Sequence, residues 1–148
     1  MFHRIVVATD FSECAQEAWG LARRIAAAPG SELVLAHVLT DVPLYGEGVF
    51  SIETARKVRE GARKWAESAL EDWVAKARAD GLGARAAVRT GVPHEEIVAL
   101  ARDEGADLVV IGTHGRGGIA RALLGSVADR VIRTAPCPVL TVRKPDPE

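Results

Sequence analysis

Five short runs of apolar and β-branched residues recur along the chain, and segments with a helical spacing of apolar residues separate them. The runs lie at residues 5–8, 33–39, 84–88, 108–111 and 139–142. Strands that alternate with helices in this way pair in parallel, because each helix carries the chain back across the sheet before the next strand. The sequence therefore predicts an α/β fold, an open five-stranded parallel sheet with helices on both faces.

Two helices are expected in the amino-terminal half. The first has Ser12 as its N-cap and ends at Pro29-Gly30. Its inward face is predicted to hold Ala15, Ala18, Ala22 and Ile25. The second spans roughly residues 52–80, and its apolar stripe is predicted to consist of Val58, Ala62, Trp65, Ala69 and Trp73.

Two further helices are expected in the carboxyl-terminal half. The third has Pro93 in its first turn and Gly105 as its C-cap. Its inward face is predicted to hold Ile97, Leu100 and Ala101. The fourth begins at Ser126 as N-cap, with Asp129 placed as in a capping box, and Pro136 prevents its continuation.

Composition and charge narrow the class of protein. A chain of 148 residues that is 48% hydrophobic has the size of one ordinary domain and buries a core without cross-links. With a net charge of −1, the chain has no overall positive field that would attract nucleic acid or an anionic membrane. Cys14 and Cys137 make no disulfide framework and are expected to be buried small hydrophobes. With no signal segment and no run near the ~18 apolar residues of a membrane span, we expect a cytoplasmic protein.

A glycine-rich turn follows the apolar run at residues 108–111. It reads Gly112-Thr113-His114-Gly115, then nine residues, then Gly125-Ser126, and it holds five glycines within fourteen residues. A buried strand that opens into such a turn brings backbone amides close to phosphate oxygens, and a helix beginning near Gly125 adds free N–H groups. One or two glycines would indicate ordinary turns; five favour an anion site and predict nucleotide binding.

The spacing Gly-x2-Gly-x9-Gly-Ser resembles that of the ATP-binding branch of the universal stress protein family. Two further segments match the family where expected: 6–13, reading Val-Val-Ala-Thr-Asp-Phe-Ser-Glu, and 135–142, reading Ala-Pro-Cys-Pro-Val-Leu-Thr-Val. The resemblance covers nearly the whole chain as one domain. It implies a Rossmann-like fold of the adenine nucleotide alpha hydrolase type, with strand order 3-2-1-4-5.

The resemblance also implies a ligand and the residues that contact it. ATP would bind together with Mg²⁺, which the phosphates would hold, at the switch point between the first and fourth strands. The residues carried over to the nucleotide site are Ala8, Thr9, Asp10, Val38, Gly112, Thr113, His114, Gly115, Arg116, Gly125, Ser126, Val127 and Ala128. The last strand would be an edge, and family members commonly dimerise through it, here through Val139, Leu140 and Val142.

Several of these residues have a purely structural alternative. Asp10 either contacts the nucleoside or caps a helix, and Ser126 can cap a helix and contact phosphate with the same geometry. Arg116 and His114 either contact phosphate or cover the turn. His37 lies inside an apolar strand and is expected to be a hydrogen-bonded core histidine.

Rival motifs are weak or absent. The chain has no Gly-x4-Gly-Lys-Ser/Thr loop, no Gly-x-Ser-x-Gly elbow and no His-Glu-x2-His or Cys-x2-Cys pair. Residues 115–120 fit the loose dinucleotide pattern, but Arg143-Lys144 stands where an acidic residue is needed after the next strand. The cations on the long helix alternate with glutamates and predict a solvated face rather than a nucleic-acid patch.

Three functions stay open. The first is an ATP-binding module that signals its nucleotide state, with no catalytic residue. The second is a slow Mg²⁺-dependent ATPase, and the third is a sensor of AMP or cyclic AMP. No general base or water-orienting residue is evident near the expected γ-phosphate, which favours the binding module.

Overall fold

Nine elements alternate along the chain in the computed structural model, which describes residues 1–40, 52–114 and 124–145. The strands are β1 (Arg4–Ala8), β2 (Glu32–Leu39), β3 (Gly83–Thr90), β4 (Leu108–Gly112) and β5 (Val139–Val142). The helices are α1 (Glu13–Ile25), α2 (Ile52–Ala79), α3 (Pro93–Asp103) and α4 (Ser126–Thr134). All strand pairs are parallel and the order is β3-β2-β1-β4-β5, which confirms the predicted fold.

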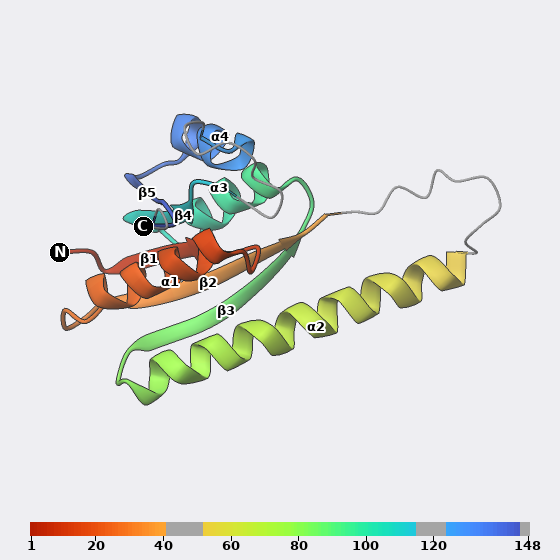
Figure 1. The fold of residues 1–148 in the computed structure, drawn as a ribbon, viewed down its shortest axis with the longest axis horizontal. Coiled ribbons are helices and arrows are strands. Elements are labelled where there is room, and N and C mark those ends of the chain that lie inside the picture. Colours follow the sequence, from red (N-terminus) through yellow and green to blue (C-terminus); the bar gives the residue numbers. More distant parts are fainter. Residues whose placement is uncertain (41–51, 115–123, 146–148) are drawn as a thin grey trace.

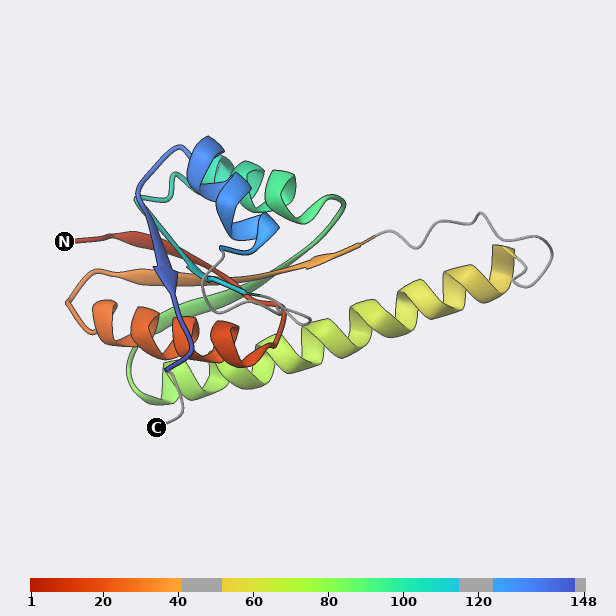
Figure 2. The same ribbon diagram turned by 45° about the horizontal axis from the view of Figure 1, so that its top comes forward.

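Two helical layers cover the sheet (Figure 1; Figure 2). Helices α1 and α2 lie on one face, and α3 and α4 lie on the other. Alternate residues of β1 point to opposite faces of the sheet. Ile5 and Val7 belong to the core under α1 and α2, while Val6 belongs to the core under α3 and α4. The central strands are apolar on both faces for this reason.

The buried stripe of α2 differs from the predicted one. Its buried residues are Ala66, Leu70, Val74 and Ala77, all in the carboxyl half. Of the predicted stripe, Trp73 is half-buried and packs against the core, whereas Val58 and Trp65 are exposed. The helix carries two apolar stripes at helical spacing, and the sheet takes the one with larger aliphatic side chains. The half of α2 before Trp65 reaches past the sheet and has no sheet to pack on (Figure 1).

Helix ends also differ from the predictions. Helix α1 ends at Ile25 rather than at Pro29, with Ala26 as its C-cap. The C-cap of α3 is Glu104, and Gly105 follows it with φ +61°. The N-cap of α4 is Gly125 without a side-chain hydrogen bond, so Ser126 is the first helical residue and not the cap.

The two cysteines are free, as predicted. Cys14 is buried, but Cys137 is only half-buried, so the expectation that both lie in the core was wrong for the second. Burial nevertheless raises the pKa of the Cys137 thiol, which keeps it in its less reactive protonated form.

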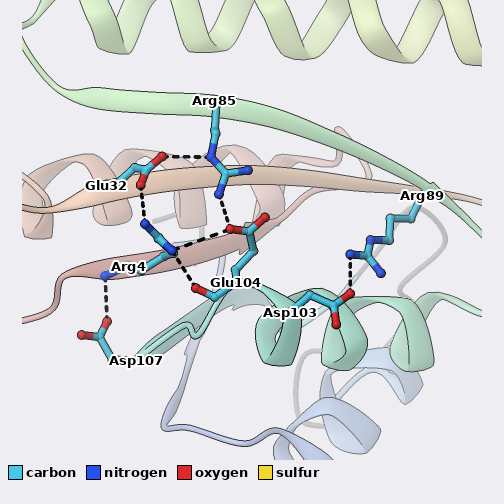
Figure 3. A network of polar contacts seen from close by, with 7 residues as sticks. All are labelled: Arg4, Glu32, Arg85, Arg89, Asp103, Glu104 and Asp107. Carbon is cyan, nitrogen blue, oxygen red and sulfur yellow. Dashed lines mark hydrogen bonds and ion pairs between the residues drawn. The ribbon is translucent and has the colours of Figure 1, made fainter.

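A network of charged side chains joins the amino-terminal ends of the strands, at the opposite edge of the sheet from the glycine-rich turn (Figure 3). Glu32 accepts from Arg4 at 3.0 Å and from Arg85 at 2.9 Å. Arg85 also donates to the Glu104 carboxylate, and Arg4 donates to the Glu104 backbone carbonyl at 2.9 Å. The network ties β1, β2 and β3 to the end of α3.

The hydrogen bond from Arg85 holds the pKa of both the Glu32 and Glu104 carboxyls below their ordinary value. A carboxyl with a depressed pKa in the folded state stabilises the fold above its unfolded pKa, about 4.3 for glutamate, and loses that contribution as pH falls. We expect Glu104→Gln to lower the free energy of unfolding at neutral pH by about 1 kcal/mol or less, because Arg85 is partly solvated.

The difference between Glu104→Gln and wild type should shrink as pH falls below about 4, where the wild-type carboxyl also becomes protonated. Urea unfolding at pH 7 and in acid measures both values. Glu60→Gln is the matched control and should change little at either pH, since the ion pair of Glu60 within the described residues is an exposed contact of 3.9 Å with Arg56. If Glu104→Gln and wild type differ by the same free energy of unfolding at both pH values, the network does not contribute to the loss of stability in acid.

Candidate functional site

A crevice of about 510 Å³ opens at the carboxyl-terminal ends of β1, β2 and β4. Its position agrees with the predicted switch point, where the order of the parallel strands reverses. Every described residue of the predicted nucleotide site lines it: Ala8, Thr9, Asp10, Val38, Gly112, Thr113, His114, Gly125, Ser126, Val127 and Ala128. The two sequence segments, about a hundred residues apart, thus meet in one hollow, whose volume suits a drug-sized ligand.

The end of β1 forms a tight turn on the crevice wall. The Thr9 hydroxyl accepts from the Phe11 amide at 3.0 Å, and an Asp10 carboxylate oxygen accepts from the Ser12 amide at 3.0 Å. Ser12 caps α1, as predicted, by accepting from the Ala15 amide at 3.2 Å. Asp10 therefore has a local role in shaping the turn, and its predicted contact with a nucleoside stays a prediction.

Phe11 is the one described non-glycine residue with a positive φ, at +64°. This conformation costs a residue with a Cβ roughly 1–2 kcal/mol. Aromatic neighbours hold the ring in place: His37 at 4.9 Å, Trp65 at 5.0 Å and Trp73 at 5.5 Å between centroids. Packing beneath the crevice thereby fixes the turn that presents Asp10 and Ser12.

Gly112 and Gly125 are required for close packing and not for a positive φ. The alternative explanation, that they are ordinary turn glycines, is therefore wrong at these two positions. Neither is among the described glycines with positive φ. A Cβ on Gly112 would lie 2.8 Å from the Cys14 Cβ, and a Cβ on Gly125 would lie 2.6 Å from the Thr113 carbonyl oxygen. The start of α4 can approach the end of β4 only because Gly125 has no side chain.

The amino terminus of α4 borders the crevice, which Ser126, Val127 and Ala128 help to line. The Gly125 amide donates to the Thr113 carbonyl at 2.7 Å, and the Asp129 amide donates to the Gly125 carbonyl at 2.9 Å. The amides of Ser126, Val127 and Ala128 lie between these bonds, where an α-helix offers no internal acceptor. They and the helix dipole form a suitable seat for an anion.

His114 has an unsatisfied nitrogen. Its Nδ1 lies 3.1 Å from the Thr113 hydroxyl, while its Nε2 is buried and has no partner among the described residues. An unpaired buried polar atom is costly, so a ligand group that supplied the missing hydrogen bond would stabilise this arrangement. Of the two predicted roles for His114, this favours contact with a ligand.

His37 is hydrogen-bonded, as predicted, but is only half-buried. Its Nδ1 lies 2.7 Å from the Thr9 carbonyl oxygen, and because a carbonyl only accepts, Nδ1 carries the proton. His37 also lines the crevice.

Sequence reasoning missed part of the lining. Ser12, Ala15, Ala36, Thr40, Pro93, Ile97 and Ile111 also contact the crevice. Pro93 and Ile97 had been interpreted only as parts of α3, although α3 begins at the same edge of the sheet as the switch point, which is the signal that could have identified them.

Other predicted features lie outside the described residues. These are Gly115, Arg116, the glycines at 117 and 118, and the segment 41–51, for which Pro43, Gly46 and Gly48 predict a loop. Within the described ranges, no cluster of three His, Cys, Asp or Glu side chains could hold a metal ion. The same ranges hold no helix that is long and apolar enough to cross a membrane.

Comparison with known proteins defines the class to which this fold and crevice belong. The profile of the universal stress protein family matches residues 1–143. The chain is 38% identical to universal stress protein MJ0531 of Methanocaldococcus jannaschii, over 100% of this chain and 86% of that protein. The chain therefore belongs to the universal stress protein family, as the resemblance predicted.

Solved structures agree with this assignment. The structure of MJ0577, from Methanocaldococcus jannaschii, has a TM-score of 0.87 at 30% identity and covers 99% of both chains. A universal stress protein in complex with cAMP has a TM-score of 0.67 at 28% identity, over 95% of this chain and 97% of that one. A universal stress protein from Archaeoglobus fulgidus in complex with dAMP has a TM-score of 0.61 at 27% identity, over 94% and 96%. Nucleotide binding is therefore found among structural neighbours of this chain.

Proposed function

We propose that the crevice binds ATP with Mg²⁺ and that the protein is a nucleotide-dependent binding or signalling module of the cytoplasmic stress response. One observation carries the proposal: the first amides of α4, for which the helix itself has no acceptor, and the His114 Nε2, which has no partner among the described residues, lie at the same crevice. Both favour the oxygens of a phosphate group. The universal stress proteins solved with cAMP and dAMP support a nucleotide as the source of that phosphate.

The two ends of the crevice suit the two ends of a nucleotide. Apolar side chains of Ala8, Val38 and Ile97 offer a dry wall for a base. The amides of Ser126 to Ala128 would hold the phosphates, and bound Mg²⁺ would neutralise part of their charge. Asp10, at the end of β1, would accept from ribose hydroxyls.

A sensor of AMP or cyclic AMP is the second candidate, because the cAMP and dAMP bound in the two complexes named above contain a single phosphate each. Calorimetric titrations with ATP·Mg, AMP and cAMP, repeated in competition, decide between them. ATP bound more tightly than both monophosphates supports the proposal. Preference for either monophosphate replaces it with the sensor, and no binding of any of the three contradicts a nucleotide site.

ATP hydrolysis is expected to be far slower than the ~1–10³ s⁻¹ typical of enzymes. Phosphoryl transfer needs an oriented nucleophile, and a water-positioning residue or cis arginine is worth roughly 10³–10⁵-fold. Asp10 is the one carboxylate among the described residues that line the crevice, and it is engaged by the Ser12 amide. Single-turnover assays with radiolabelled ATP measure the rate. Turnover in the enzymatic range that survives repurification and is lost in Gly125→Val would establish the ATPase instead.

A further inference from the structure

The amino half of α2 stands away from the rest of the described chain. Both views show it reaching beyond the sheet (Figure 1; Figure 2). None of the residues 52–65 is buried, and the buried residues of α2 begin at Ala66. A helical segment of this length is marginal in water without tertiary contacts, so a partner that packs against it would stabilise it.

An apolar stripe runs along this segment and into the next turn of α2; we define it as Val58, Ala62, Trp65 and Ala69, of which the first three are exposed and Ala69 is half-buried. Val58 is 51% exposed and Trp65 is 55% exposed. Successive members are four, three and four residues apart, the spacing of a seam between two packed helices. The Trp65 ring meets the Phe11 ring edge-on at 5.0 Å, so its orientation is set in advance of any docking. A large, pre-oriented aromatic ring is typical of an anchor in a protein interface.

Charge divides α2 at the centre of the stripe. Residues 53–64 contain five cations and two carboxylates, a net charge of +3. Residues 65–72 contain three carboxylates, Glu67, Glu71 and Asp72, and no cation, a net charge of −3. The helix therefore carries opposite charge on either side of Trp65, next to the same apolar stripe.

We propose that the α2 stripe packs against the α2 stripe of a second copy of this chain, with the two helices antiparallel and crossing near Trp65. This places the positive segment of each helix along the negative segment of the other, and Ala62 of one copy opposite Ala69 of the other. A parallel pair would bring like charges together. An anionic membrane surface fits less well, because it would attract one segment and repel the other. The contact is separate from β5, because α2 packs on β2 and β3, whereas β5 is the edge strand at the other end of the sheet order. It does not rest on the proposed function.

Cysteine cross-linking tests the geometry. In Ala62→Cys/Ala69→Cys, the two cysteines of one helix are about 10.5 Å apart along the axis, too far for a disulfide, which needs Cα atoms about 4.4–6.8 Å apart. We expect mild oxidation to give a covalent dimer of the double variant on a non-reducing gel. The single variants should give no covalent dimer, because an antiparallel pair separates identical positions 62 and identical positions 69. Wild type controls for native Cys14 and Cys137.

Charge variants test the proposed pairing. In the register that places Ala62 opposite Ala69, Arg59 lies opposite Asp72 of the other copy, so Arg59→Glu should slow cross-linking of the double variant roughly tenfold, equivalent to 1.4 kcal/mol. Adding Asp72→Lys should restore it. The same cross-linking results are expected in a Thr141→Pro background, in which the β5 edge is disrupted. They would show that this contact is distinct from a β5 dimer.

Three outcomes overturn the proposal: no cross-link in the double variant, single variants that cross-link as well as the double, or no response to the charge exchange. Binding to phosphatidylglycerol vesicles that is lost in Trp65→Glu, without cross-linking, would assign the stripe to a membrane surface.

Discussion

Gly125→Val is expected to raise the dissociation constant for ATP at least ~100-fold, equivalent to about 2.7 kcal/mol. A Cβ at this position would lie 2.6 Å from the Thr113 carbonyl oxygen, so the start of α4 must move away from the end of β4. That movement displaces the amides of Ser126, Val127 and Ala128 from the proposed phosphate seat. Overpacking of this kind also costs about 1–3 kcal/mol of stability, which circular dichroism and urea unfolding will show separately from binding.

Gly125→Ala and Gly20→Ala make the test specific. Gly125→Ala adds the same Cβ without branching. The backbone at Gly125, with φ −62°, already suits alanine, so this variant isolates the contact of the Cβ with the Thr113 carbonyl oxygen. It should lose most of the ATP affinity that Gly125→Val loses. Gly20 has open space around its missing Cβ, so Gly20→Ala should bind ATP like wild type and be up to ~1 kcal/mol more stable. A folded Gly125→Val protein with wild-type affinity would show that the phosphates do not bind at the start of α4.

Thr141→Pro is expected to convert the proposed β5 dimer to a monomer. Val109 donates to the Pro138 carbonyl at 3.0 Å and Thr113 donates to the Val142 carbonyl at 2.9 Å. In a parallel ladder this pattern assigns residues 138, 140 and 142 to bonds with β4, so the amide of Thr141 points away from the sheet. Proline removes that outward donor at an edge position that tolerates it.

Light scattering of Thr141→Pro, in the Trp65→Glu background so that the α2 contact does not contribute, measures the change in mass. Leu140→Pro is the comparison, because its amide is assigned to β4 and its loss should destabilise the fold itself. A Trp65→Glu protein that is already monomeric, or a Thr141→Pro variant that remains dimeric, would remove the β5 edge from the interface.

The strands of the sheet could be predicted from the sequence because each is an apolar run with clear turn residues on either side. Their parallel pairing follows from the alternation with helices. The sequence could not assign the buried face of α2. Val58 and Trp65 form one apolar stripe, and Leu70 and Val74 form another, so periodicity offered two solutions and only contact with β2 and β3 selects between them.

The sequence predicted which residues line the crevice, but not the physical reasons why they are needed there. The residues of the two motifs meet as expected, yet Gly125 is required by its approach to Thr113, a tertiary contact that local sequence does not encode. Phe11 was missed because residues with positive φ are usually glycines, and here aromatic rings distant in the chain maintain it. The network of Arg4, Glu32, Arg85 and Glu104 joins strand ends that the sequence places far apart.

Amide NMR during a titration with ATP·Mg tests the central claim most directly, because it reports the position of binding residue by residue. The amides of Ser126, Val127 and Ala128 and that of Gly112 should show the largest shifts, with smaller ones at Thr9 and Asp10, and the His114 ring should change as its Nε2 gains a partner. Amides of Glu32, Arg85 and Glu104, at the opposite edge of the sheet, should stay in place. No shifts at saturating ATP, or shifts centred away from the crevice, would contradict a nucleotide site between β1 and β4.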